Sequence, residues 1–224
     1  MRNGIVRIES IEIRNFKNVG YGYLNFENSR KGYKASILGL YGQNGSGKTA
    51  LIEAIELLHL CLTGRTIPAS FADFVNVDNE FTRIKYEFKV QNLKEQSSYS
   101  AFYEVSLRRD IDESTHNTEQ PVDDVVYKAT LFDEVLSYSY KCGDKKTRLS
   151  PIIDTRTLDD VVFVPTAKYN AIIGKDKETE TSLLVAKQIA RATSRSFVFS
   201  RELLNRVRLN CKEDYLNCKC AQAR

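Results

Sequence analysis

Eight consecutive residues, Gly42 to Thr49, have the types and spacing needed to hold a chain of phosphates. They read Gly-Gln-Asn-Gly-Ser-Gly-Lys-Thr and fit the G-x-x-x-x-G-K-[ST] pattern of a P-loop. Glycines let the backbone wrap closely around a phosphate, so that successive N–H groups point inward. Lys48 is then expected to reach the β- and γ-phosphates, and the Thr49 hydroxyl to bind Mg²⁺. The motif predicts binding of a nucleoside triphosphate with Mg²⁺, and a chance glycine-rich turn is the alternative.

The segments on either side of the motif agree with this prediction. Residues 35–41 form a short apolar run that is typical of a buried strand, and residues 50–60 consist almost wholly of helix formers. Strand, glycine-rich loop and helix therefore follow one another in the order that a P-loop requires. Lys48 is the one residue expected to act in catalysis. The residues expected to bind the nucleotide through this loop are Gly42, Asn44, Gly45, Ser46, Gly47, Lys48 and Thr49.

Hydrolysis also needs a carboxylate that helps to hold the metal and a group that positions the attacking water. Residues 129–134 (Ala-Thr-Leu-Phe-Asp-Glu) imitate such a site, the Walker B motif, because an apolar run precedes Asp133 and Glu134. Alternation of apolar and polar residues resumes directly afterwards, at Val135. We therefore expect Asp133 and Glu134 to form a hairpin turn in an antiparallel sheet rather than a metal site.

The rest of the chain is predicted to be mainly β up to about residue 165, and helical from about residue 178. Residues 5–19 alternate apolar and polar with a change of phase near Glu9 and Ser10, which indicates a strand with a bulge. Residues 23–26 are its expected hairpin partner, and residues 110–124 form a polar, acidic loop. Further strands are expected at residues 82–90, 99–109, 125–132, 134–141, 147–153 and 161–165.

Composition limits the class of protein. No apolar run of the 224 residues approaches the length of a membrane span, and the first residues have no apolar segment typical of a secretory signal. The five cysteines are odd in number and scattered, which favours a reduced, cytoplasmic setting, with Cys61 expected to be a buried free thiol.

Positive charge is concentrated at the end of the chain. The net charge is +4, yet the residues from 187 onward carry nine basic against three acidic side chains. Lys187, Arg191 and Arg195 recur every four residues, so they share one helix face. This face could bind DNA or an acidic partner, or it could be an ordinary solvated face.

Two segments carry a resemblance to a known group of proteins. Residues 11–18 (Ile-Glu-Ile-Arg-Asn-Phe-Lys-Asn) are similar to the "I-x-I-x-N-F-K/R" opening strand, and residues 41–55 to the "G-x-N-G-[SA]-G-K-[ST]-x-[LI]-x-[ED]-A-[IL]" segment, of ABC-type ATPases grouped with RecF, SMC and OLD-like proteins. Within this group the sequence most resembles AAA-family ATPases of bacterial phage-defence and abortive-infection systems. The resemblance covers about residues 8–62, roughly a quarter of the chain.

The resemblance implies the N-terminal lobe of such an ATPase, an α/β fold of P-loop NTPase type. It implies a mixed sheet around the P-loop helix, an antiparallel β-subdomain and C-terminal helices. Residues 1–175 are expected to form the lobe and residues 176–224 a helical segment that begins an arm or lid. The bound nucleotide is expected to be ATP, sandwiched in a dimer, with Arg14, Asn15 and Lys17 close to it. Alternatively, these three residues are the solvated end of a strand.

The family's signature motif, its acidic Walker B pair and its switch histidine have no convincing copy in this sequence. The chain is therefore expected to be an N-terminal fragment or split subunit, which hydrolyses ATP only when a C-terminal half completes it. The resemblance implies an ATPase that couples nucleotide-driven dimerisation to DNA or to a nuclease or toxin effector, in phage defence or DNA repair. The alternatives are a nucleotide-gated scaffold without turnover, and, with less support, a P-loop kinase of small molecules.

Overall fold

The computed structural model describes residues 4–27, 39–92, 97–112, 125–142, 145–146, 148–156 and 177–206. Its strands are β1 (Gly4–Phe16), β2 (Val19–Asn25), β3 (Phe81–Asn92), β4 (Ser97–Ile111), β5 (Tyr127–Cys142), β6 (Lys145–Lys146) and β7 (Ser150–Asp154). Its helices are α1 (Lys48–Thr63), the 3-10 helix η1 (Ala69–Phe74), α3 (Lys177–Ala192) and α4 (Arg201–Arg206).

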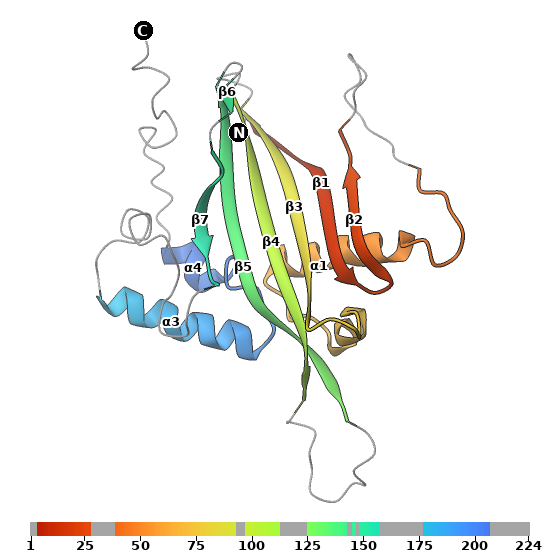
Figure 1. Ribbon diagram of the computed structural model, residues 1–224. Helices are drawn as coiled ribbons and strands as arrows, with labels where there is room; N and C mark the ends of the chain where they lie inside the picture. The colour runs from red at the N-terminus through yellow and green to blue at the C-terminus, as the bar shows by residue number, and fades with distance from the viewer. Residues whose placement is uncertain are drawn as a thin grey trace, which may run out of the picture.

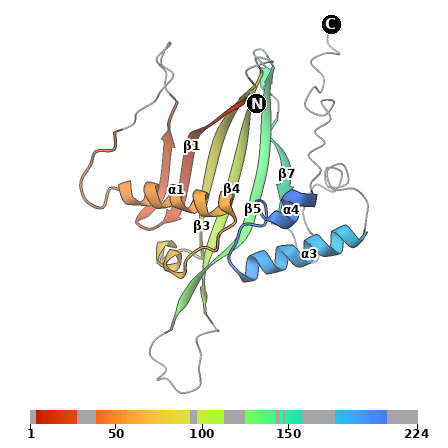
Figure 2. The same ribbon diagram turned by 180° about the vertical axis from the view of Figure 1, so that it is seen from behind.

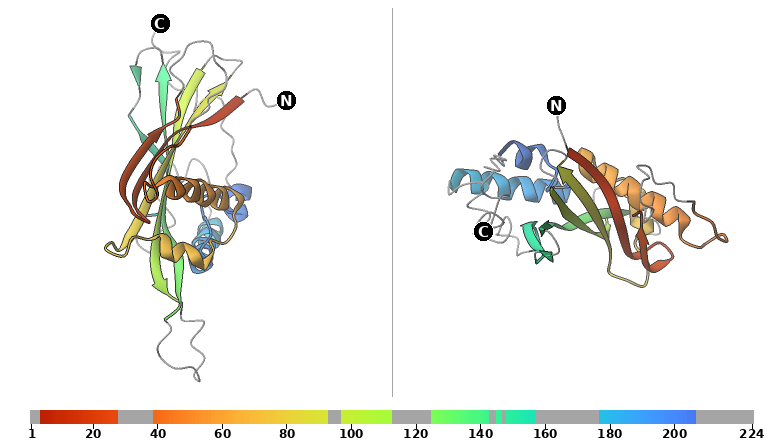
Figure 3. Two further views of the ribbon diagram at one scale, coloured as in Figure 1. Left: turned by 90° about the vertical axis from the view of Figure 1, so that its right-hand side faces the viewer. Right: turned by 90° about the horizontal axis from the view of Figure 1, so that it is seen from above.

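The strands form one sheet in the order β2-β1-β3-β4-β5-β6, with β7 also paired to β5 (Figure 1). Each pairing between these strands is antiparallel. Among the described residues, all the helices lie on one face of the sheet and none covers the other, which is called the open face below (Figures 2 and 3). Strands β4 and β5 extend together beyond the rest of the sheet as a two-stranded ribbon.

The alternation of side chains along the strands decides which face the helices cover. Ile11 and Ile13 of β1 are buried, as are Ile84 and Tyr86 of β3. Because successive side chains of a strand point to opposite faces, the charged residues between them, such as Glu12, point to the open face. The core therefore forms between one side of the sheet and the helices.

Helix α1 lies across this apolar face. Its residues Ala54, Leu57 and Leu58 are buried, and the Tyr86 hydroxyl donates a hydrogen bond to the Ala54 carbonyl at 2.6 Å. The helix ends at Gly64, which has a φ of 64° and donates its N–H to the carbonyls of the last turn. Burial of an apolar stripe and a glycine C-cap thus explain where α1 packs and where it stops.

Several sequence predictions are confirmed. The register of β1 against β3 shifts between Ile8 and Ser10, so the expected bulge is present, and β2 is the hairpin partner of β1. The P-loop helix and the helix from about residue 178 are both observed, and β3, β4 and β7 match the expected strands with small changes of bounds.

The predicted hairpin turn at Asp133 and Glu134 is wrong. Strand β5 runs through both residues and pairs with β4 on either side of them. Its register shifts at Phe132, because Ser106 pairs with Asp133 whereas Leu107 pairs with Leu131. The extra residue of a bulge interrupts the alternation of apolar and polar residues, as a turn would, and so misled the prediction.

Some predictions concern residues outside the described ones. They are residues 35–38 of the expected P-loop strand, residues 113–124 of the acidic loop, the strand at 161–165 and the tail beyond 206. Residues 39–41 are described and do not belong to a strand. The described strands therefore form one antiparallel sheet with helices on one face, and the parallel part of the expected mixed sheet is not among them. The boundary between residues 175 and 176 stays a prediction.

Candidate phosphate-binding site

The loop from Gly42 to Gly47 leads directly into α1. Gly42, Gly45 and Gly47 have φ angles of 154°, 84° and 87°, which residues with a side chain rarely adopt. A Cβ on Gly42 would also lie only 2.9 Å from the Ser46 hydroxyl oxygen. The three glycines of the motif are thus required by the shape of the loop.

Lys48 folds back over this loop from the first position of α1. Its ammonium nitrogen donates hydrogen bonds to the carbonyls of Gly42 at 2.7 Å and Gln43 at 2.8 Å, and to the Ser46 hydroxyl at 3.1 Å. The charge is therefore held across the mouth of the loop, where it can meet an anion.

The start of α1 adds further donors. The first N–H groups of a helix have no partner inside it and carry its positive dipole end, so they attract phosphate. The intrahelical ladder begins with the Leu51 N–H, which donates to the Gly47 carbonyl at 3.2 Å. Thr49 is exposed in the first turn, where its hydroxyl can bind a metal ion. The loop, the ammonium group and this hydroxyl fit a triphosphate with Mg²⁺.

The structure places the three residues expected near the nucleotide in different surroundings. Lys17 pairs with Glu53 of α1 at 2.6 Å and lies over the Phe74 ring, 4.4 Å from its centroid. Asn15 has a φ of 54°, and its carbonyl accepts a hydrogen bond from Asn76. Both therefore belong to the end of the β1–β2 hairpin that approaches α1.

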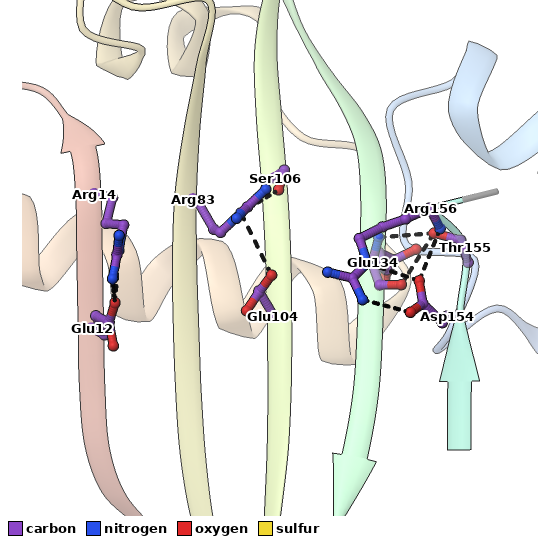
Figure 4. Close-up of polar contacts among 9 residues, drawn as sticks. All are labelled: Glu12, Arg14, Arg83, Glu104, Ser106, Glu134, Asp154, Thr155 and Arg156. Atoms are coloured by element: carbon purple, nitrogen blue, oxygen red, sulfur yellow. Dashed lines mark hydrogen bonds and ion pairs between the residues drawn. The ribbon is translucent and has the colours of Figure 1, made fainter. Parts of the chain in front are cut away.

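Arg14 instead lies on the open face of the sheet, away from α1. It pairs with Glu12 at 2.7 Å (Figure 4). It also packs over the Tyr21 ring. The structure therefore does not bring Arg14 together with the loop. The roles of Arg14, Asn15 and Lys17 next to a nucleotide stay predictions.

Asn18, at the turn between β1 and β2, was missed by sequence reasoning. Its side-chain amide donates a hydrogen bond to the carbonyl of Gly45, in the middle of the loop. The two residues are 27 positions apart, and no local pattern in the sequence joins them.

Glu134, the glutamate of the Walker B imitation, is fully enclosed by protein donors. Its carboxylate accepts hydrogen bonds from the Tyr103 hydroxyl at 2.6 Å, the Ser196 hydroxyl at 2.5 Å and the N–H of Phe197 at 2.7 Å. Burial raises the pKa of Glu134, and the hydrogen bonds oppose this rise. Glu134 thus connects the sheet to the segment between α3 and α4, and its carboxylate has no open side for a metal.

The open face of the sheet carries rows of paired charges. Arg83 lies 3.5 Å from Glu104 and 3.4 Å from the Ser106 hydroxyl, and Arg156 lies 2.6 Å from Asp154 (Figure 4). Burial raises the pKa of Asp154, but hydrogen bonds from Arg156 outweigh this effect and hold the pKa below its usual value. Such pairing balances positive against negative charge.

The basic residues of α3 do not form a continuous exposed stripe. Lys187 is only 8% exposed, and Arg195, beyond the helix end, donates to the Thr66 hydroxyl at 2.8 Å. Of the three residues of the expected face, Lys187 is therefore buried, and Arg195 is exposed but hydrogen-bonded to the segment that follows α1.

Comparison with known proteins agrees with the fold and the loop. The chain matches the AAA domain family over residues 10–205, and it belongs to this family. It is also 40% identical over 63 residues to the DNA replication and repair protein RecF of Deinococcus radiodurans. That match covers 28% of this chain and 15% of the RecF protein, so the chain spans a small part of this relative's length. The resemblance to a RecF- and SMC-like ATPase lobe is confirmed.

Two further observations concern the described residues. No helix among them is long and apolar enough to cross a membrane. Within the same residues, no three histidine, cysteine, aspartate or glutamate side chains gather where they could hold a metal ion. Cys61 is a buried free thiol, as expected.

Proposed function

We propose that this chain binds ATP with Mg²⁺ through the loop Gly42–Thr49, as the nucleotide-binding lobe of an ATPase. The observation that carries the proposal is the arrangement of Lys48 across a loop of three glycines with positive φ, at the start of α1. Backbone N–H groups of the loop bind the phosphate oxygens, and Lys48 neutralises the β- and γ-phosphates. The Thr49 hydroxyl binds Mg²⁺, which neutralises charge on the same phosphates.

Turnover requires a second half, which is either another segment of the same protein or a second copy of the chain. Support comes from the outer side of α1, where Ile52, Ile55 and Leu62 are 62%, 40% and 47% exposed. Tyr41, directly before the loop, is 94% exposed. These apolar side chains lie before the loop and along the outer side of α1, and they form a surface that a further layer of the molecule would cover.

We also propose that nucleotide-driven dimerisation transmits the ATP state to DNA or to a nuclease or toxin effector, in DNA repair or phage defence. The partial similarity to RecF supports the DNA-repair side of this proposal. A nucleotide-gated scaffold without turnover is the second candidate. It is favoured by Glu134, because the most Walker B-like pair among the described residues uses its glutamate for internal hydrogen bonds.

Titration of the chain with fluorescent ATP tests nucleotide binding. Lys48→Ala is expected to weaken binding by at least about tenfold, because hydrogen bonds to charged groups contribute about 1.5–3 kcal/mol. Lys85→Ala, which removes a lysine from the open face of the sheet, is the matched control and is expected to bind normally. Equal affinity of wild type and Lys48→Ala would disprove the proposal.

Phosphate release, measured with and without DNA, separates the two candidate functions. DNA-stimulated release supports the ATPase, whereas nucleotide binding without any release, also in the presence of the completing half, supports the scaffold.

A further inference from the structure

The turn between β1 and β2 contacts the phosphate-binding loop at two points. Asn18 donates its side-chain amide to the Gly45 carbonyl. Val19 lies over Gly47, and its Cγ2 would be only 2.8 Å from a Cβ at that position. A third contact, the ion pair between Lys17 and Glu53, joins the same turn to α1. Three successive residues of the turn thus reach the loop and the helix that follows it.

The turn is itself fixed by the last residue of η1 and by the segment after it. The Lys17 N–H donates to the Phe74 carbonyl at 2.6 Å, and the Asn76 side chain donates to the Lys17 carbonyl at 3.1 Å. The Asn76 N–H donates to the Asn15 carbonyl at 3.0 Å. These bonds hold Asn15 and Lys17 at positive φ, a conformation that costs energy outside glycine. Asn18 is therefore presented from a fixed support.

We propose that Asn18 and Val19 are positioning residues, which set the peptide orientation of the P-loop without contacting the nucleotide. A trans peptide is planar, and its C=O and N–H point in opposite directions. Because Asn18 holds the Gly45 carbonyl toward the hairpin, the N–H of Ser46 is turned to the inner side of the loop. In agreement, this N–H donates a hydrogen bond to the Gln43 carbonyl at 3.3 Å, across the loop, and a phosphate oxygen would replace that carbonyl as its acceptor. The inference rests on the proposed function, because the orientation of the Ser46 N–H affects ligand binding only if the loop binds phosphate.

The expected loss of nucleotide affinity in Asn18 variants is that of one hydrogen bond at an exposed position. Removing the donor with Asn18→Ala is expected to weaken MgATP and MgADP binding by about three- to tenfold, the range of a single net hydrogen bond. Asn18→Gln keeps an amide donor and should recover much of this loss. Asn18→Asp places a carboxylate beside the loop, so its affinity should fall further and recover partly as salt is added.

Asn25→Ala is the matched control. Asn25 is an exposed asparagine of the same hairpin, and its side chain accepts only a local hydrogen bond from the Glu27 N–H among the described contacts. It should bind MgATP like the wild type, and both alanine variants should unfold at the wild-type temperature.

A second measurement does not depend on nucleotide. In the full wild-type chain the ¹⁵N order parameters of Gly45 and Ser46 are expected to be about 0.85, the value of a rigid backbone. In Asn18→Ala they are expected to fall toward the flexible range below about 0.6. If order parameters change while even the wild type fails to bind MgATP, the proposed function is wrong and the positioning of the loop by Asn18 stands. Unchanged order parameters and affinity in Asn18→Ala, or an equal loss in Asn25→Ala, would overturn the inference.

Discussion

Replacing Glu134 by alanine is expected to destabilise the chain strongly. Glu134 is only 2% exposed, and its carboxylate is the shared acceptor for the hydroxyls of Tyr103 and Ser196 and the backbone N–H of Phe197. The alanine variant leaves these buried donors without their acceptor. Each unsatisfied buried group costs about 1–3 kcal/mol, so a total of roughly 3–5 kcal/mol follows if some donors find water or a new partner.

For a domain of this size each kcal/mol lowers the melting temperature by about 2–4 °C, so the drop should be roughly 6–20 °C. The assay is thermal unfolding followed by circular dichroism, repeated in urea to obtain the free energy of unfolding. Glu134→Gln keeps one acceptor oxygen but turns an NH₂ group toward other donors, so its loss should be intermediate.

Glu104→Ala is the matched control. Glu104 also lies in the sheet, but on the open face, where it pairs with Arg83 at 3.5 Å. A partly exposed pair at this distance contributes about 1 kcal/mol or less. A Glu134→Ala variant that melts within about 2 °C of the wild type, or no lower than Glu104→Ala, would refute the structural role of Glu134.

Two further predictions concern titratable groups. Burial, together with the charge of Glu134, raises the pKa of the Cys61 thiol far above its usual value, so iodoacetamide should modify Cys61 only after unfolding. Mass spectrometry of the peptide that contains Cys61 measures the modification. Rapid modification of Cys61 in the native chain would contradict the prediction. The pKa of Asp154 is lowered in the folded chain, so the Asp154–Arg156 pair stabilises above the unfolded-state pKa, and this contribution is lost as the pH falls through the folded value. The Asp154 side chain is largely buried, so Asp154→Asn should lower the free energy of unfolding at pH 7 by about 1–3 kcal/mol, with a difference from wild type that shrinks in acid, and an equal difference at every pH would argue against the pair.

The loop could be predicted from the sequence because its determinants are local. Glycines, Lys48 and the helix formers that follow stand within a few residues of one another, and their conformations follow from their own steric freedom. The bulge near Ser10 could be predicted for the same reason, since the change of phase lies within one strand. The burial of Cys61 could be predicted as well, because this residue lies in the apolar helix that follows the loop.

The contacts that hold the site together could not be predicted in this way. Asn18 and Gly45 meet only because the hairpin turn folds against α1, and Glu134 meets Ser196 across 62 residues. At Asp133 and Glu134, by contrast, a local pattern was present but predicted the wrong structure. There a bulge at Phe132 gives the same local pattern as a turn, and only the pairing with β4 distinguishes the two.

The most direct test of the account asks whether the site recognises phosphates. Mg²⁺ tripolyphosphate and adenosine are each added to wild-type chain loaded with fluorescent ATP, and displacement is followed by anisotropy. Because the loop amides and the Lys48 ammonium act on the phosphate chain, tripolyphosphate is expected to displace the nucleotide and adenosine is not. Displacement by adenosine together with none by tripolyphosphate would contradict the central claim.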